Sequence, residues 1–117
     1  MMTTYTKNVS EPWFSLIKIG AKKCEGRLKK GDFDLMKKGD TIIFENNEFD
    51  FPRSFRCKIT SVHHYPSFKT YLETETLERC LPGIDTVENG VSIYHKYYKE
   101  EDEIKVGVNA FRLRVSK

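Results

Sequence analysis

Apolar and polar positions in the first part of the chain change between helical and extended spacing. Trp13, Leu16 and Ile17 recur at i, i+3 and i+4, which predicts a short helix. Ser10 is a favourable N-cap residue and Gly20 a natural stop, so the helix is expected between them. The patterns that follow predict a strand, a helical turn and a second strand, in that order, at 23–28, 33–36 and 41–45.

The middle of the chain continues with one strand and two short helices. Residues 54–62 alternate in character and are expected to pair with the preceding strand as a hairpin with a long polar loop. A further helix begins near Ser67, where serine again suits a cap. The phase of the apolar residues slips near Glu75, so we expect two short helices with a break there.

The last third of the chain predicts one more helix and a closing strand. Asp85 has the spacing of a capping box, and an apolar stripe at helical spacing follows it as far as Tyr98. The acidic run at 100–103 is interpreted as a solvated turn. Residues 106–115 alternate between apolar and basic side chains and predict the terminal strand.

The order of the predicted elements indicates the fold class. Helix, strands, helices and a last strand follow one another without a regular βαβ alternation. A mixed α+β fold around a small β-barrel is therefore expected, with residues 1–117 as one domain.

Basic side chains are concentrated in one stretch of the chain. Residues 18–38 contain eight basic and three acidic side chains, a local net charge of +5, whereas the whole chain carries only +3. A cationic surface on a nearly neutral molecule suits a partner that carries phosphate groups. Exposed lysines on an ordinary solvated surface would give the same pattern, and composition alone does not separate the two.

The remaining composition argues against several other classes of protein. The cysteines, Cys24, Cys57 and Cys80, form no C-x-x-C pair, and Cys24 is expected as a buried strand residue. His63 and His64 are adjacent on a strand and point to opposite faces, which does not suit two ligands of one ion. No metal and no cofactor are expected. No apolar run approaches a membrane span and the N-terminus has no signal-peptide pattern, so an intracellular, cytoplasmic protein without membrane partners is expected, a monomer being favoured.

One short motif carries most of the information on identity. Residues 20–27 have the pattern G-x-K-x-x-E-x-R between a predicted helix and a predicted strand. Together with the stretches at 11–14, 81–83 and 94–98, this motif resembles the ASCH domain family of the PUA-like superfamily, and the likeness extends over about residues 6–115. The resemblance implies a PUA-like β-barrel surrounded by short helices, with the motif lining a cleft. Relatives of this architecture bind RNA, some ASCH proteins hydrolyse N4-acetylcytidine, and ribonuclease activity is known for others.

The motif residues also have a chemistry of their own. Glu25 and Arg27 share one face of a strand because side chains alternate along it, and Lys22 lies where the helix stops. Arginine offers bidentate donors, lysine a point charge, and glutamate an acceptor for an exocyclic amine. Lys22, Lys23, Glu25 and Arg27 are therefore candidates for binding RNA or a modified nucleoside, with Tyr97 as an aromatic ring that faces the partner.

Three alternatives to an RNA-binding site remain open at this point. The first is an enzyme, an amidohydrolase or a ribonuclease, in which Lys22 and Glu25 would be catalytic. In the acetylcytidine hydrolases that the motif resembles, a threonine stands at the position of Glu25, and a carboxylate there favours the ammonium form of Lys22. The second is a protein-interaction adaptor with a closed cleft, and the third is an ion-pair network with a structural role only.

Overall fold

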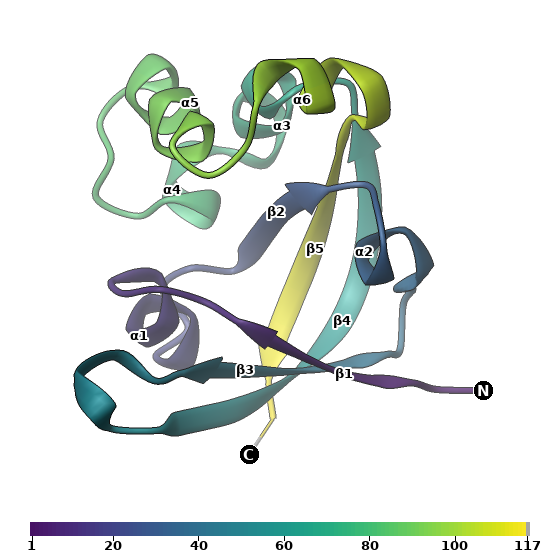
Figure 1. Cartoon of the computed structure of the whole chain (residues 1–117), viewed down its shortest axis with the longest axis vertical. Helices are drawn as coiled ribbons and strands as arrows, with labels where there is room; N and C mark the ends of the chain where they lie inside the picture. The colour runs from purple at the N-terminus through teal and green to yellow at the C-terminus, as the bar shows by residue number, and fades with distance from the viewer. Residues whose placement is uncertain (117) are drawn as a thin grey trace.

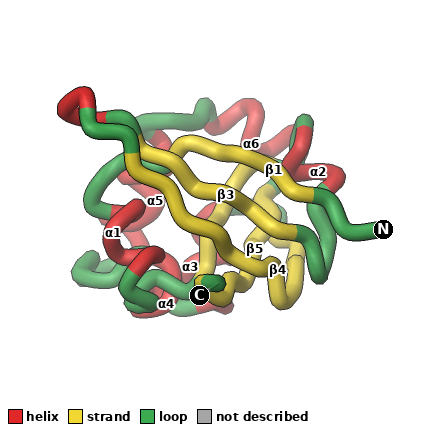
Figure 2. Tube along the Cα trace, turned by 90° about the horizontal axis from the view of Figure 1, so that it is seen from below, coloured by secondary structure: helices red, strands yellow, loops and turns green. Residues whose placement is uncertain are grey.

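Five strands form one curled sheet in the computed structural model, which describes residues 1–116 (Figure 1). The strand order is β1-β3-β4-β5-β2, with β1 parallel to β3 and the other neighbouring pairs antiparallel. Seen from below, β1 and β3 lie side by side across the sheet (Figure 2). The strands are β1 (Thr4–Asn8), β2 (Cys24–Leu28), β3 (Thr41–Asn46), β4 (Arg53–Tyr65) and β5 (Val108–Val115).

Short helices connect and cover the strands. The helices α3, α4, α5 and α6 gather at one end of the sheet, whereas α1 and α2 lie on either side of β2 further down (Figure 1). No helix within residues 1–116 is long and apolar enough to cross a membrane. The helices are α1 (Trp13–Lys18), α2 (Asp32–Leu35), α3 (Phe68–Glu75), α4 (Leu77–Cys80), α5 (Val87–His95) and α6 (Glu100–Val106), with a 3₁₀ turn η1 (Glu48–Asp50) between β3 and β4.

The core consists of two clusters of buried apolar side chains. One cluster packs α3, α4 and α5 against β2 and β5, with Tyr71 and Leu72 of α3 at its centre. The other packs α1 against β3 and β4, where Ile42 and Phe44 alternate with half-buried neighbours along β3. Trp13 of α1 packs against both clusters and joins them.

The structure confirms the α+β fold class and the main run of elements. The strands predicted at 23–28, 41–45, 54–62 and 106–115 are present, and α3 and α4 meet at Thr76, next to the predicted break. The strand β1 was not predicted, because its side chains are mostly polar and it lies at the edge of the sheet. Its partner β3 is far along the sequence, so local pattern gave no signal for it.

Three details of the helices differ from the sequence-based expectation. Ser10 is not the cap of α1, which begins at Trp13 after Pro12 without a side-chain cap. Thr86 rather than Asp85 caps α5, because the Thr86 hydroxyl accepts a hydrogen bond from the Asn89 N–H at 3.1 Å. The acidic run at 100–103 forms the first turn of α6, where negative charge is favourable at the positive end of the helix dipole.

The cap of α5 gives a direct test of the local structure. We expect Thr86→Ala to lower the free energy of unfolding by about 1 kcal/mol, because it leaves the Asn89 N–H without its acceptor. Asp85→Ala removes only an exposed side-chain contact to Asn89 and is expected to have a smaller effect. Urea unfolding of both variants provides the measurement, and an equal loss in the two would show that Asp85 shares the cap.

Candidate functional site

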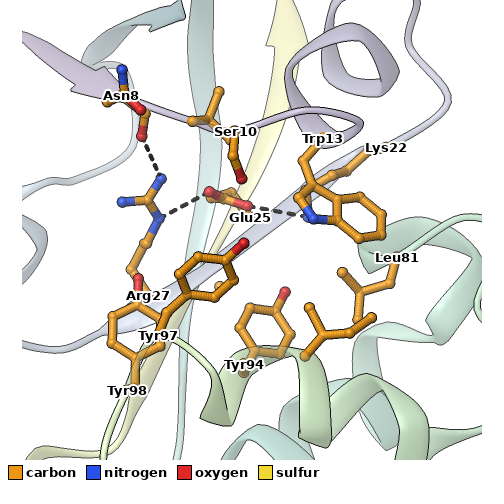
Figure 3. A pocket seen from close by; sticks show the side chains of 13 residues that line it. Asn8, Ser10, Trp13, Lys22, Glu25, Arg27, Leu81, Tyr94, Tyr97 and Tyr98 are labelled. Carbon is orange, nitrogen blue, oxygen red and sulfur yellow. Dashed lines mark hydrogen bonds and ion pairs between the residues drawn. The ribbon is translucent and has the colours of Figure 1, made fainter. Parts of the chain in front are cut away.

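A pocket of about 190 Å³ opens between the end of β1, α1, β2 and α5 (Figure 3). Its wall includes Lys22, Glu25 and Arg27 of the motif, and Tyr97 follows α5 at the opposite side. Four of the five side chains proposed from the sequence therefore lie around one cavity.

Lys22 is turned into the interior by the backbone that follows α1. The helix ends at Lys18, Gly20 takes a φ of 82°, and the N–H group of Lys22 donates to Leu16 O at 2.9 Å. Such a φ favours glycine, which explains the first residue of the motif. The side chain of Lys22 is only 1% exposed, so a charged group enters the protein interior.

The ammonium of Lys22 has an acceptor for each of its three N–H groups. Nζ donates to Cys24 O at 2.6 Å and to Cys80 O, and it lies 3.1 Å from Glu25 Oε1. The aromatic ring of Trp13 lies 5.9 Å from Nζ. A fully bonded lysine of this kind holds α4 and β2 together and fixes the position of the Glu25 carboxylate.

Glu25 and Arg27 lie side by side on β2, as the alternation of the strand predicts. Arg27 Nε donates to Glu25 Oε2 at 2.9 Å, and Arg27 Nη2 donates to Asn8 O at 3.0 Å. The guanidinium also lies over the ring of Phe33, 5.0 Å from its centre. Tyr98 also lies next to the guanidinium: burial raises the pKa of the Tyr98 hydroxyl, and the charge and hydrogen bonding of Arg27 oppose that rise.

The two cations keep Glu25 ionised although it is buried. Burial by itself raises the pKa of the Glu25 carboxyl, but the charges of Lys22 and Arg27 and their hydrogen bonds outweigh it and hold the pKa below its ordinary value. Burial likewise lowers the pKa of Arg27, and the carboxylate of Glu25 more than compensates and raises it. The pocket wall therefore presents a carboxylate and a guanidinium, both charged at neutral pH.

Gly26 stands between these two residues and permits a close approach. A Cβ atom at this position would lie 2.5 Å from the ring of Tyr71, which is fully buried. Any larger residue would displace Tyr71 or push β2 outwards. The glycine within the motif thus allows α3 to pack directly behind the strand that carries Glu25 and Arg27.

Aromatic rings form the side of the pocket that faces β2. Tyr94 is buried, stacks on Phe68 with ring centres 4.3 Å apart, and shares a hydrogen bond of 3.1 Å between its hydroxyl and that of Tyr71. Tyr98 also stacks on Phe68 and is half-buried. Tyr97, in contrast, is 63% exposed, so its ring is available to a ligand at the mouth of the pocket.

The segment that connects β1 to α1 covers the pocket and is held from behind. Val9 O accepts a hydrogen bond from Asn46 Nδ2 at 2.9 Å, and the carboxylate of Glu11 accepts one from Arg53 Nη1 at 2.9 Å. Asn46 and Arg53 face each other across the β3–β4 pair. The hairpin therefore fixes the backbone whose Asn8 carbonyl binds Arg27.

Of the residues proposed from the sequence, Lys22, Glu25, Arg27 and Tyr97 line the pocket and Lys23 does not. Lys23 follows Lys22 directly, so its side chain takes a different direction. It lines a second groove and not the pocket. The eight basic residues of 18–38 lie on several elements: Lys22 is buried, Arg27 lies within β2, and the others lie at the end of α1, on either side of β2 and between α2 and β3. Residues that line the pocket without having been proposed include Asn8, Val9, Ser10, Trp13, Leu81, Ile93, Tyr94 and Tyr98. The helical spacing of Trp13, Tyr94 and Tyr98 indicated packing. In the structure they pack against the core and also line the pocket.

The cysteine side chains do not line the pocket. Cys24, Cys57 and Cys80 are free and buried, and burial raises the pKa of the Cys57 thiol to about 12. Within residues 1–116 no group of three or more histidine, cysteine or acidic side chains is placed to hold a metal ion.

The fold and this pocket define the protein as a PUA-like α+β domain. The chain belongs to the ASCH domain family, whose model matches residues 8–116, and this family is generally associated with RNA binding. No curated protein matches the chain.

Two solved structures resemble the protein over almost its full length. The crystal structure of hypothetical protein PH0355 has a TM-score of 0.86 and 37% sequence identity, and the match covers 98% of this chain and 100% of that one. The solution NMR structure of protein PF0455 from Pyrococcus furiosus has a TM-score of 0.79 and 34% identity, and covers 99% of each chain. The PUA-like ASCH fold expected from the motif is confirmed.

Glu25→Gln tests whether the ion pairs of the pocket wall stabilise the fold. The amide would leave the Lys22 ammonium buried without a counter-charge, so we expect the free energy of unfolding at neutral pH to fall by about 3 kcal/mol or more. The folded-state pKa of Glu25 lies below its ordinary value of 4.5, so its contribution is complete above that pH and is lost as the pH falls through the folded pKa. The difference between parent and variant should therefore shrink in acid.

Urea unfolding at neutral pH and at about pH 3.5 measures this difference. Glu73→Gln is the matched control, because Glu73 is exposed and makes no ion pair within residues 1–116. A loss of stability in Glu25→Gln that stays constant with pH would mean that shape, and not charge, determines the effect.

Proposed function

We propose that the pocket binds single-stranded RNA by taking up one nucleobase between the charged pair of β2 and the ring of Tyr97. The observation that carries the proposal is the fixed pair of Glu25 and Arg27 at 2.9 Å, which places an acceptor and a donor next to each other on one wall. A base edge presents the complementary pair, an exocyclic amine beside a ring nitrogen or carbonyl oxygen. Family membership adds to this support, because ASCH domains are generally associated with RNA.

The size and lining of the pocket suit a single base. A volume of about 190 Å³ is smaller than the ~300–1,000 Å³ typical of pockets for drug-sized ligands, so the space accommodates one flat ring system. The exposed ring of Tyr97 offers a stacking partner, and stacking does not depend on which base is bound. An open pocket also weighs against the adaptor hypothesis, which assumed a filled cleft.

The bonding of Lys22 weighs against the hydrolytic alternatives. Its three N–H groups are directed at Cys24 O, Cys80 O and Glu25, and the side chain is almost completely buried. To act as a base or nucleophile, the nitrogen would have to lose a proton and turn a lone pair towards the substrate. That change would leave at least one buried acceptor without a donor, so the geometry supports a positioning role for Lys22.

Arg27→Ala and Tyr97→Ala test the proposed binding mode. We expect Tyr97→Ala to weaken the binding of a mixed-sequence single-stranded octaribonucleotide by roughly 5- to 100-fold, since one stacked base contributes ~1–3 kcal/mol. Tyr97→Phe keeps the ring and should bind like the parent. Arg27→Ala should lose most of the binding while the protein stays folded, because Glu25 keeps its second partner, Lys22.

Fluorescence anisotropy with a labelled octaribonucleotide measures these affinities, and thermal unfolding checks the fold. Arg56→Ala is the control for the loss of one positive charge, because Arg56 is exposed and lies on β4 away from the pocket. Parent-like binding by Arg27→Ala would place the RNA elsewhere. Outright unfolding of this variant would make the motif architectural.

A separate experiment addresses the amidohydrolase alternative. We expect no release of cytidine from N4-acetylcytidine by the folded protein, because Lys22 has no free lone pair directed into the pocket. Chromatographic separation of the two nucleosides provides the measurement. Turnover that disappears in Lys22→Ala and persists in Lys23→Ala would replace the binding proposal with an enzymatic one.

A further inference from the structure

A second depression lies beside the pocket, on the other side of the turn that follows α1. Its volume is about 430 Å³, and its wall comes from the end of α1, the turn to β2 and the last residues of β5. Three of its lining side chains, Lys18, Lys23 and Arg114, are exposed and basic, and none of the lining residues is acidic. We refer to this depression as the basic groove.

Among the described residues, the exposed cations of the basic groove make no ion pairs, whereas several basic residues elsewhere are paired with carboxylates. Lys29 and Lys37 lie within 4.0 Å of aspartates, and Arg112 binds Glu75 at 2.9 Å. Within residues 1–116, no ion pair involves Lys18, Lys23 or Arg114. Like charges around one depression repel one another, and a bound anion would remove that repulsion.

The backbone around the basic groove is held in place before any ligand binds. Lys23 N donates to Arg79 O at 2.8 Å, and Leu113 N donates to Lys23 O at 2.9 Å. The turn from α1 is closed by the bond from Gly20 N to Ile17 O at 2.9 Å. The groove wall is therefore fixed to α4 and β5, so that a ligand would have to order only the long basic side chains.

Lys22 connects the basic groove to the pocket, because it forms part of the wall of both. Lys22 thus lies between the pocket, where a base is proposed to bind, and the basic groove with its three unpaired cations. The groove also has an apolar surface, to which the exposed Ile19 contributes. A sugar–phosphate chain carries anionic phosphates and less polar sugars, which complement the cations and the apolar surface of the groove. A free nucleoside has no phosphate to bind the cations.

We propose that the basic groove binds the phosphodiester backbone of the strand whose base occupies the pocket. The inference rests on the proposed RNA-binding function and adds to it the place where the phosphates of the strand bind. Phosphate contacts fix the position of a strand, and the pocket contacts a base. Lys18, Lys23 and Arg114 would thus supply most of the salt-dependent part of the affinity.

The test compares two triple variants with the same change in charge. Lys18→Ala/Lys23→Ala/Arg114→Ala empties the basic groove of its exposed cations. Lys38→Ala/Lys69→Ala/Lys105→Ala is the control, because these three lysines are exposed, line neither depression and make no ion pair within residues 1–116. Circular dichroism and thermal unfolding establish that both variants are folded.

Anisotropy titrations with the labelled octaribonucleotide, between about 50 and about 300 mM KCl, give the affinity and its dependence on salt. Each phosphate contact to a single strand contributes about 0.7 to the slope of log K against log salt, so the groove variant should lose about 2 from that slope. Its affinity at low salt should fall at least tenfold. The control should keep the parent's slope, with an affinity within about threefold of the parent's.

The outcomes separate this inference from the proposed function. If the parent binds the octaribonucleotide and the groove variant matches the control in slope and affinity, the groove has no part in binding and the inference fails alone. If the parent binds no octaribonucleotide at low salt, the RNA-binding proposal fails and the inference fails with it. Loss of binding to phosphatidylserine vesicles in the groove variant, with RNA binding unchanged, would overturn the inference in favour of a membrane surface.

Discussion

The burial of the Lys22 ammonium is the constraint on which the rest of the site depends. A charge in the protein interior is stable only where its donors are all satisfied, and here two backbone carbonyls and one carboxylate do so. The carbonyls belong to Cys24 on β2 and to Cys80 at the end of α4. The short helix α4 is thereby attached to the sheet, although it has only one turn of its own.

The same charge organises the pocket wall through a chain of contacts. Lys22 holds Glu25, Glu25 accepts from Arg27 at 2.9 Å, and Arg27 donates to the Asn8 carbonyl at 3.0 Å. Four bonded groups thus extend from α4 across β2 to the end of β1. Substitution of Glu25 removes the partner of both cations and affects mainly the stability of the fold, whereas loss of Arg27 leaves Glu25 paired with Lys22 and affects mainly the ligand surface.

Local sequence pattern predicts the part of the site that lies on one strand. The alternation along β2 places Glu25 and Arg27 on a common face, and the glycine before Lys22 marks the turn. The same logic separates Lys23 from Lys22, because adjacent residues point in different directions. The sequence therefore contained the information that separates Lys23 from Lys22, although Lys23 was predicted to belong to the same site.

The contributions of Asn8, Leu81 and Tyr94 depend on contacts between segments far apart in the chain. Asn8 lies at the site because β1 pairs with β3. Its partner in the register is Glu45, 37 positions further along the chain. A polar edge strand such as β1 shows no periodic signal in the sequence. Apolar spacing predicted the helical stripe of α5 as far as Tyr94, whereas Tyr98 lies beyond the end of the helix. A buried tyrosine has the same spacing whether or not a cavity lies beside it. The interpretation of residues 1–117 as one domain stays a prediction.

The pocket lies at the seam between the two core clusters, and this position explains why it stays open. Leu81 and Tyr94 belong to one cluster and Val9 to the other, and Trp13 packs against both. Each cluster is closed by its own side chains, and the charged pair on β2 prevents apolar residues from filling the space between them. A base in this space would contact both clusters through Trp13 and its neighbours. Binding would therefore stabilise the relative position of the clusters, by the general linkage between ligand affinity and folding.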